Sequence, residues 1–396
     1  MLDEKQNERK ARVLADLGQV VVKIGSGVLA DANGLDAAVI ARIASEVAEI
    51  RARGLAVTIV SSGAIAAGRR VLGGKPRSIP ERQAAAAVGQ IDLMSHWRDA
   101  FARHGVAVAQ ILLDAADLAD RQRYLNAEHT LATLHQRGII PIVNENDTVA
   151  VDELKFGDND NLSALVAILV GAGLLVILSD VDALFTANPS VRPDARRVPV
   201  LDEVDDAALG MTGSEAGQLG TGGMRSKLLA AGKAAAGGIP TMIAGGRTSG
   251  ILPRILEPAA DVGTLVLPGA DRLAKRKHWI AYALPPRGEF RCDAGAAAAV
   301  RGGGRSLLPS GVVSVAGNFA AGDCVRLLDP DGREFGRGLS SYHAAEATRI
   351  AGRRSAEVES ILGYSLGDAV VHRDDLVLTE PGTVGKGSGS DGDDGR

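Results

Sequence analysis

Apolar residues recur in two alternating patterns through about residue 267. Short runs rich in Val, Ile and Leu are typical of buried strands, and longer segments with apolar residues three and four positions apart are typical of helices. Their repeated alternation predicts a three-layer α/β/α sandwich around a mostly parallel open sheet. The expected strands are Gln19–Lys23, Val57–Val60, Val106–Leu113, Ile139–Val143, Leu174–Leu178, Thr241–Ala244 and Thr264–Leu267, and the expected helices include Asp36–Arg53, Pro80–His104 and Arg225–Ala236.

One apolar segment is long enough to suggest a membrane span. Leu162–Ser179 holds 18 uncharged residues, and about 20 apolar residues cross a bilayer as a helix. However, the glycines of residues 171–173 divide the segment, and Asp160 and Asp180 flank it closely. The pattern therefore predicts a buried helix, a turn and a buried strand, and no membrane association.

The pattern changes after Pro268. Short β-like runs separated by glycine turns follow, and they predict a separate β-rich domain over residues 287–380. The expected division is an N-terminal extension (1–17), an α/β domain (18–268), a linker (269–286), the β-rich domain, and a disordered Gly/Ser/Asp-rich tail (381–396). The expected β-rich runs are Val312–Val315, Cys324–Leu328 and Arg333–Gly338.

Composition and charge narrow the class of protein. The 396 residues leave room for two or three domains, and 49 glycines with 3% aromatic residues suit a closely packed α/β protein. A net charge of −4 gives no global reason to expect nucleic acid or anionic membrane as a partner. Cys292 and Cys324 support neither a disulfide framework nor a metal site, and the charged N-terminus lacks the apolar stretch of a signal peptide. We expect a cytoplasmic protein.

The acidic run Asn144–Asn161 constrains function most strongly. Its sequence, NENDTVAVDELKFGDNDN, holds six carboxylates and a single lysine, Lys155. Crowded carboxylates resist burial, so the run needs a metal, an ammonium group or distant lysines, unless it is a solvated turn. Open α/β sheets bind ligands at the carboxyl ends of their strands, where this run begins. It is no EF-hand, because the required Asn/Asp, Gly and Glu positions hold Leu162, Ser163 and Leu169.

Two segments pair glycines with a lysine. Lys23 ends a predicted strand and precedes Gly25-Ser26-Gly27, and Gly217–Lys227 leads into a predicted helix. Glycine backbone N–H groups together with a lysine can bind a polyphosphate, although a surface turn or a flexible loop fits each pattern as well. The second segment departs from the P-loop motif, because no Gly-Lys-Ser/Thr follows four spacer residues.

Two further strand ends carry polar residues. Ser61-Ser62-Gly63-Ala64 opens a helical stretch, where small residues can bind a carboxylate or phosphate, or simply cap the helix. Ser179-Asp180 ends an apolar strand, where an acidic side chain can hold a ribose hydroxyl. A nucleotide and a small zwitterion would use all of these features.

Six segments between about Gly18 and Pro268 resemble the glutamate 5-kinase family of the amino-acid-kinase superfamily. They read VVKIGSG, SSGAIAAGR, NENDTV, FGDNDNLSA, LLVILSDVDALF and GTGGMRSK. The last third resembles a PUA domain, a β-rich pseudo-barrel, through RCDAGAAAAV, SLLPSGVVSVAGNF and YHAAEATRIAG. The first glycine loop departs from the family pattern at Gly27, where a hydroxyl residue is usual, so no side-chain role is carried to that position.

The resemblance implies ATP- and Mg²⁺-dependent phosphorylation of the side-chain carboxylate of L-glutamate to L-glutamyl 5-phosphate, the first step of proline biosynthesis. It implies catalytic roles for Lys23, Lys227 and Asp160. The implied substrate-binding residues are Ser62, Gly63, Asp147 and Asn159, and the implied nucleotide-binding residues are Lys23, Gly25, Ser26, Ser179, Asp180, Thr221, Gly222, Gly223, Met224, Arg225, Ser226 and Lys227.

The resemblance also implies partners and leaves alternatives open. A homo-oligomer (dimer or tetramer), feedback inhibition by proline and hand-over of the product to a glutamyl-phosphate reductase are expected. N-acetylglutamate kinase or aspartokinase would share the fold and the lysines, but an acetylated substrate has no ammonium group for Asp147. RNA binding through the PUA domain is a secondary possibility with weak support, because residues 287–380 hold 11 Arg and no Lys against 13 Asp and Glu.

Overall fold

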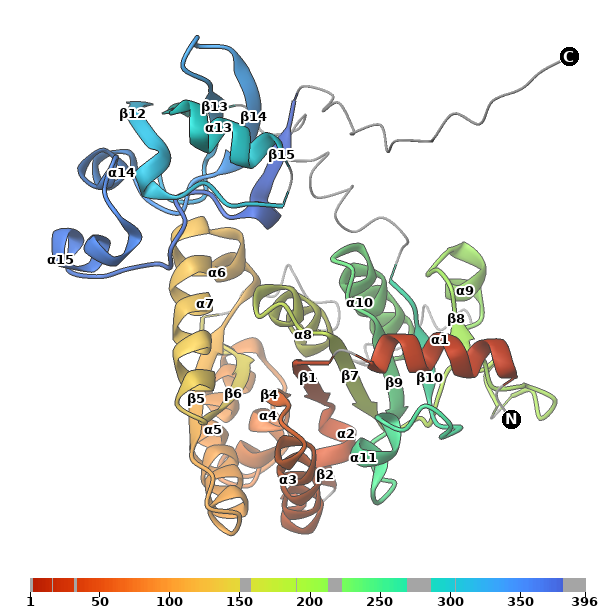
Figure 1. Ribbon diagram of the computed structural model, residues 1–396. Coiled ribbons are helices and arrows are strands. Elements are labelled where there is room, and N and C mark those ends of the chain that lie inside the picture. Colours follow the sequence, from red (N-terminus) through yellow and green to blue (C-terminus); the bar gives the residue numbers. More distant parts are fainter. Residues whose placement is uncertain are drawn as a thin grey trace, which may run out of the picture. The chain divides into compact units, whose positions relative to one another are not determined.

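The structure is a computed structural model. It describes residues 3–15, 17–31, 34–149, 158–189, 191–212, 223–268, 286–302 and 304–379. The chain forms two compact units, one within residues 1–272 and the other within residues 273–396 (Figure 1). Each unit has its own sheet and its own apolar core.

An eight-stranded sheet forms the centre of the first unit, in the order β5-β6-β4-β1-β7-β9-β10-β8. Neighbouring strands are parallel except for β9 and β10, so the predicted mostly parallel open sheet is confirmed. The two-residue strand β8 was not predicted, because two residues are too few to show a period. The strands are β1 (Gln19–Ile24), β4 (Ala56–Ser61), β5 (Val108–Leu113), β6 (Ile140–Glu145), β7 (Leu174–Ser179), β8 (Val200–Leu201), β9 (Thr241–Gly245) and β10 (Thr264–Val266).

Helices cover both faces of this sheet. Val20 and Val22 of β1 belong to the core cluster formed with α3 (Ala37–Ala52) and α5 (Ile79–Ala102). Val21 belongs to the opposite cluster, formed with α7 (Arg121–Gln136), α8 (Asp158–Leu169) and α10 (Met224–Ala236). Because side chains alternate along a strand, Lys23 lies on the α8 and α10 side. The three-layer architecture is confirmed.

Shorter elements complete the first unit. The N-terminal helix α1 begins with a capping box between Asp3 and Gln6. The elements are α1 (Glu4–Leu14), α2 (Ser26–Leu29), α4 (Ala64–Gly68), α6 (Ala115–Ala119), α9 (Asp206–Gly210) and α11 (Ile251–Ile255), with the hairpin of β2 (Ala30–Asp31) and β3 (Gly34–Leu35).

The segment Leu162–Ser179 is a helix, a turn and a strand, as predicted: it covers most of α8 and all of β7. Among the described helices, none combines the length and hydrophobicity needed to cross a membrane. Helix α8 begins at Asp158, however, so residues 158–161 of the acidic run form its first turn and not a loop. Carboxylates favour a helix N-terminus, whereas the apolar pattern used for prediction starts only at Leu162. Residues 150–157 of the run lie outside the described residues.

The second unit is a five-stranded mixed sheet in the order β12-β11-β13-β14-β15. The predicted β-rich domain is confirmed, although β11 and β15 were missed and the strand expected at Arg333–Gly338 is displaced by one residue. Phe290, Phe335 and Tyr342 fill its core. Its elements are β11 (Gly288–Cys292), α13 (Ala294–Arg301), η2 (Pro309–Gly311), β12 (Val312–Gly317), β13 (Cys324–Leu328), β14 (Glu334–Leu339), α14 (Ala344–Ile350), η3 (Ser355–Glu357), α15 (Val358–Leu362), η4 (Arg373–Asp375) and β15 (Leu376–Leu378).

Two glycines allow α4 and α5 to touch backbone to backbone. A Cβ atom on Gly89 of α5 would lie 1.9 Å from the Ala64 carbonyl oxygen of α4. A Cβ atom on Gly68 of α4 would likewise lie 1.9 Å from the Ala85 carbonyl oxygen. Contact this close holds α5 against the segment that follows β4.

We expect Gly89→Ala to destabilise the first unit by about 2–3 kcal/mol, because the added methyl group meets backbone atoms that cannot move independently. Thermal unfolding followed by circular dichroism measures this effect. Gly210→Ala is the matched control, since a Cβ atom there meets nothing within 4 Å. Equal midpoints for the two variants would contradict this account of the contact.

Candidate functional site

The parallel strands bring the predicted site residues to one edge of the sheet. β1 lies between β4 and β7, and β6 lies beyond β4. The carboxyl ends of β1, β4, β6 and β7 lead to Gly25, Ser62, Asp147 and Ser179-Asp180, respectively. The chain winds from β1 toward β5 on one side and continues through β7 and β9 on the other, so β1 is a topological switch point, where α/β sheets bind their ligands.

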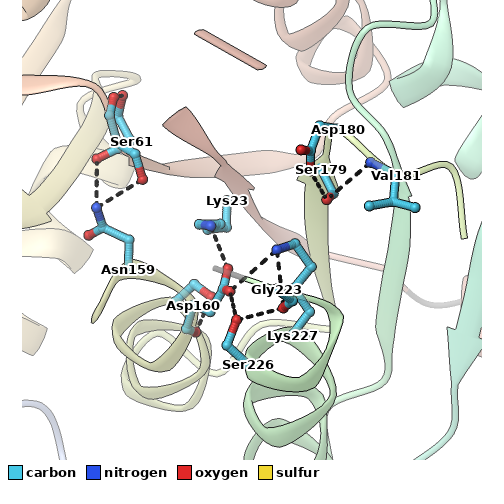
Figure 2. A network of polar contacts seen from close by, with 12 residues as sticks. Lys23, Ser61, Asn159, Asp160, Ser179, Asp180, Val181, Gly223, Ser226 and Lys227 are labelled. Atoms are coloured by element: carbon cyan, nitrogen blue, oxygen red, sulfur yellow. Dashed lines mark hydrogen bonds and ion pairs between the residues drawn. The ribbon is translucent and has the colours of Figure 1, made fainter. Parts of the chain in front are cut away.

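Lys23, Asp160 and Lys227 meet at this edge, from β1, α8 and α10 (Figure 2). Lys23 Nζ forms a short ion pair with Asp160 Oδ1. Lys227 Nζ lies 3.7 Å from the other carboxylate oxygen, Oδ2. The exposed fractions of the three residues are 4%, 1% and 3%. Two ammonium groups therefore share one carboxylate in the interior, and the charge of Asp180 also acts on Lys227.

Burial and charge act in opposite directions on these groups. Burial alone would raise the pKa of Asp160, but the charges of Lys23 and Lys227 hold that pKa below its ordinary value. Burial lowers the pKa of Lys227, against the attraction of Asp160. Two ammonium groups held close together at the first turn of a helix attract negative charge, so the cluster is electrostatically suited to a bound anion.

The first turn of α10 supports this cluster. The Ser226 hydroxyl donates to Asp160 Oδ2 at 2.7 Å, and Lys227 Nζ lies 3.4 Å from the Gly223 carbonyl oxygen. Gly223 caps helix α10 without a side-chain hydrogen bond, and the N-terminus of a helix favours an anion. Met224 and Arg225 belong to the same turn, whereas Thr221 and Gly222 lie outside the described residues.

The first glycine loop differs in part from the expectation that its N–H groups face a phosphate. The N–H of Gly25 donates to the Leu178 carbonyl oxygen at 3.1 Å, and Ser26 begins the short helix α2. A Cβ atom on Gly25 would lie 3.7 Å from Lys23 Nζ, and one on Gly27 would lie 3.5 Å from Asp180 Oδ2. These glycines thus keep side-chain atoms away from the lysine and from Asp180.

A second polar group lies where β4 and β6 end. Asn159 Nδ2 donates to Ser62 Oγ at 3.0 Å and to Asn144 Oδ1 at 3.1 Å. Gly63 has a φ of 111°, in the left-handed region that favours glycine, and its carbonyl oxygen accepts the N–H of Ala67 in α4. Asn159 and Asp160 are adjacent on α8, so this group is directly linked to the lysine cluster (Figure 2).

The remaining predicted residues lie on the same edge. Ser179 is buried and its hydroxyl donates to Asp180 Oδ1 at 3.0 Å, while Asp180 itself is exposed. Asp147 is half-buried in the turn that follows β6.

Sequence reasoning missed Gln90 and Trp97, and it gave Ser61 and Asn144 no individual role. Asn144 is 1% exposed, and its amide donates to Gln90 Oε1 at 2.8 Å. Trp97 Nε1 donates to Ser61 Oγ at 3.0 Å. Gln90 left a signal in the sequence, because it interrupts an otherwise apolar stripe of α5, whereas Asn144 was counted only as part of the acidic run.

A protein-only metal site is not found among the described residues, which contain no group of three or more His, Cys, Asp or Glu suited to an ion. The buried carboxylate of Asp160 is already bonded to two lysines and a serine. The described side chains therefore do not fit an all-protein Mg²⁺ site.

We expect Asp160→Asn to cost roughly 3–5 kcal/mol of stability near neutral pH, because it leaves two buried ammonium groups without their carboxylate. The depressed pKa of Asp160 means that its contribution is present above its ordinary pKa of 3.8 and is lost as pH falls through the folded-state value. Unfolding measured against pH should therefore show the two proteins converging in acid. The exposed Asp99→Asn is the control, and a pH-independent difference would contradict the assignment.

Similarity to known proteins extends over both units. Residues 18–245 match the amino acid kinase family and residues 288–362 match the PUA domain. The glutamate 5-kinase of Geobacter sulfurreducens is 51% identical over 372 residues, covering 93% of this chain and 100% of that protein. Those of Pelobacter propionicus and Meiothermus ruber are each 50% identical over 363 residues, covering 91% of this chain and 97% and 95% of theirs. The chain belongs to the glutamate 5-kinase family of amino acid kinases.

Proposed function

We propose that this protein transfers the terminal phosphoryl group of ATP to the side-chain carboxylate of L-glutamate. The product is L-glutamyl 5-phosphate, the first intermediate of proline biosynthesis. The observation that carries the proposal is the buried cluster in which Lys23 and Lys227 share Asp160, since two ammonium groups held at one point suit a transferring phosphoryl group. Relatives named glutamate 5-kinase match this chain over nearly their whole length, and this similarity supports glutamate as the acceptor.

The reaction requires charge neutralisation more than proton transfer. A glutamate side-chain carboxylate has a pKa of about 4.3, so it is already an anionic nucleophile at neutral pH. Its approach to a triphosphate is opposed by electrostatic repulsion. Catalysis therefore depends on positioning and on cations beside the transferred group.

In this proposal Lys23 and Lys227 stabilise the phosphoryl oxygens, and Asp160 holds both lysines in place. Asp160 is no general base, because the lysines keep its pKa below the ordinary value and its oxygens accept their hydrogen bonds. The three residues lie on β1, α8 and α10, which are regular elements of the fold. This placement restricts the conformational freedom of the two ammonium groups.

Substrate positions follow from the two ends of the site. We assign glutamate to the group of Ser62, Gly63, Asn159 and Asp147, with the Asp147 carboxylate facing the substrate ammonium. We assign the nucleotide to the rim formed by Gly25, Ser26, Ser179, Asp180 and residues 221–227. Asn159 and Asp160 are consecutive, so α8 links the acceptor to the lysines.

Mg²⁺ would accompany the nucleotide. It usually binds phosphate oxygens, water and one or two carboxylates, and the described residues offer it no protein-only site. When bound it would neutralise phosphate charge, and the lysines would act beside it.

Further assignments extend the proposal. We assign catalysis to residues 18–268 and the PUA domain to residues 287–380. We further propose that the protein is a cytoplasmic homo-oligomer and that proline inhibits it. Its product would pass to a glutamyl-phosphate reductase. RNA binding has less support, because three arginines of the second unit are paired with its carboxylates: Arg326 with Glu289, Arg337 with Glu334 and Arg301 with Asp329.

The purified protein should release ADP from ATP only when L-glutamate is present. A coupled ADP assay with glutamate, N-acetylglutamate and aspartate measures acceptor choice, and added proline measures inhibition. N-acetylglutamate should be inactive, because it has no ammonium group for Asp147. Transfer to aspartate or N-acetylglutamate in preference to glutamate would point to another amino-acid kinase.

Lys227→Ala should lower kcat by about 10²–10³-fold, with the glutamate KM within about threefold of wild type. The physical reason is that the ammonium group acts on the phosphoryl group and not on glutamate binding. Lys233→Ala, on the exposed side of the same helix, is the matched control. Near-normal turnover of Lys227→Ala would remove the basis of the assignment.

A further inference from the structure

One polar residue interrupts the buried stripe of α5. The buried residues of this helix include Ala86, Leu93, Trp97 and Phe101, at helical spacing, and Gln90 lies among them. Gln90 is 9% exposed. Burying an amide costs free energy unless it is hydrogen-bonded, and an apolar side chain would fit the stripe at lower cost. Gln90 therefore calls for a reason beyond packing.

Gln90 belongs to a chain of three amides whose orientation is fixed by one backbone group. The Glu145 N–H donates to Asn144 Oδ1 at 2.9 Å. A backbone N–H can only donate, so the atom that it meets must be the oxygen of the Asn144 amide. The Asn144 nitrogen must then face Gln90, which accepts through Oε1 at 2.8 Å. Rotating either amide by 180° would place two donors or two acceptors in contact.

The same constraint passes to Asn159. Its Nδ2 donates to Asn144 Oδ1 at 3.1 Å and to Ser62 Oγ at 3.0 Å. The carbonyl oxygen of Asn159 is consequently directed away from these residues, and it has no hydrogen-bond partner among the described residues. Figure 2 shows the Asn159 nitrogen turned toward the end of β4. An oriented, unbonded acceptor beside Ser62 suits a cationic or hydroxyl donor of a ligand.

We propose that Gln90 is a positioning residue for the acceptor amino acid: its carbonyl oxygen holds in place the Asn144 amide that the Glu145 N–H orients, and Asn144 in turn holds Asn159 against Ser62. The inference rests on the proposed function, in which Asn159 and Ser62 contact glutamate. Gln90 bonds to neither of these two residues. Its influence on the substrate therefore passes through Asn144.

Gln90→Met tests this role, because methionine has similar length but neither donates nor strongly accepts. The glutamate KM should rise roughly 3- to 10-fold, the effect of one lost hydrogen bond, while kcat and the ATP KM stay within about twofold. A purely structural role would instead reduce the amount of active enzyme and so lower the apparent kcat at an unchanged KM. Gln136→Met, at an exposed position of α7, is the matched control.

A double-mutant cycle with Asn144→Ala gives the decisive comparison. If Gln90 acts through Asn144, adding Gln90→Met to Asn144→Ala should leave the glutamate KM within about twofold of that of the single Asn144 variant. The inference would be overturned if the effects of the two substitutions on the glutamate KM multiplied in the double variant. It would also be overturned if Gln90→Met alone left the glutamate KM unchanged. Gln90→Asn, which withdraws the amide by one methylene, replaces Gln90→Met if the latter does not fold.

A wild-type protein inactive on glutamate would refute the proposed function and this inference with it. An active wild type whose glutamate KM is insensitive to substitution of Gln90 would refute only the inference.

Discussion

The ion cluster of Lys23, Asp160 and Lys227 is the constraint on which the rest of the first unit depends. Charged groups this deeply buried are tolerated only when they are paired closely, and one carboxylate here serves two ammonium groups. The central strand and two helices must therefore meet at one point, although Lys23 and Asp160 are 137 positions apart along the chain and Asp160 and Lys227 are 67 apart. The fold supplies this meeting through α8 and α10, which pack side by side over β1 and β7.

The same arrangement connects stability to chemistry. The two ammonium groups and the carboxylate of this cluster interact more strongly in the low-dielectric interior than they would in water. The two ammonium groups repel each other in the free protein, and a bound anion beside them would offset this repulsion. Enzymes often have lower stability at a functional site because its charges are already positioned for the reaction. Such preorganised charges need not be rearranged during the reaction.

Support for the site extends one layer outward to α5. Its two close-packed glycine contacts bring the helix against α4, and its buried side chains reach the ends of β4 and β6: Trp97 bonds to Ser61 and Gln90 to Asn144. A helix that contributes no charged residue to the site thus holds two of its strand ends. The second unit is built differently, around an aromatic core and a mixed sheet of its own.

The layered α/β fold, the β-rich C-terminal unit and the residue types of the site could all be predicted from the sequence, because periodicity and strand-end motifs are local properties. Lys23 and Lys227 were identified through neighbouring glycines, and Asp160 through the motif that contains it. Three features came from the three-dimensional structure: one carboxylate bridges both lysines, Asp160 lies on a helix, and the Gly25 amide is bonded within the protein. The structure alone revealed the partnership of Gln90 and Asn144. Hydrogen bonds between segments far apart in the sequence depend on how the helices and strands pack. No local sequence pattern specifies the distance between such side chains.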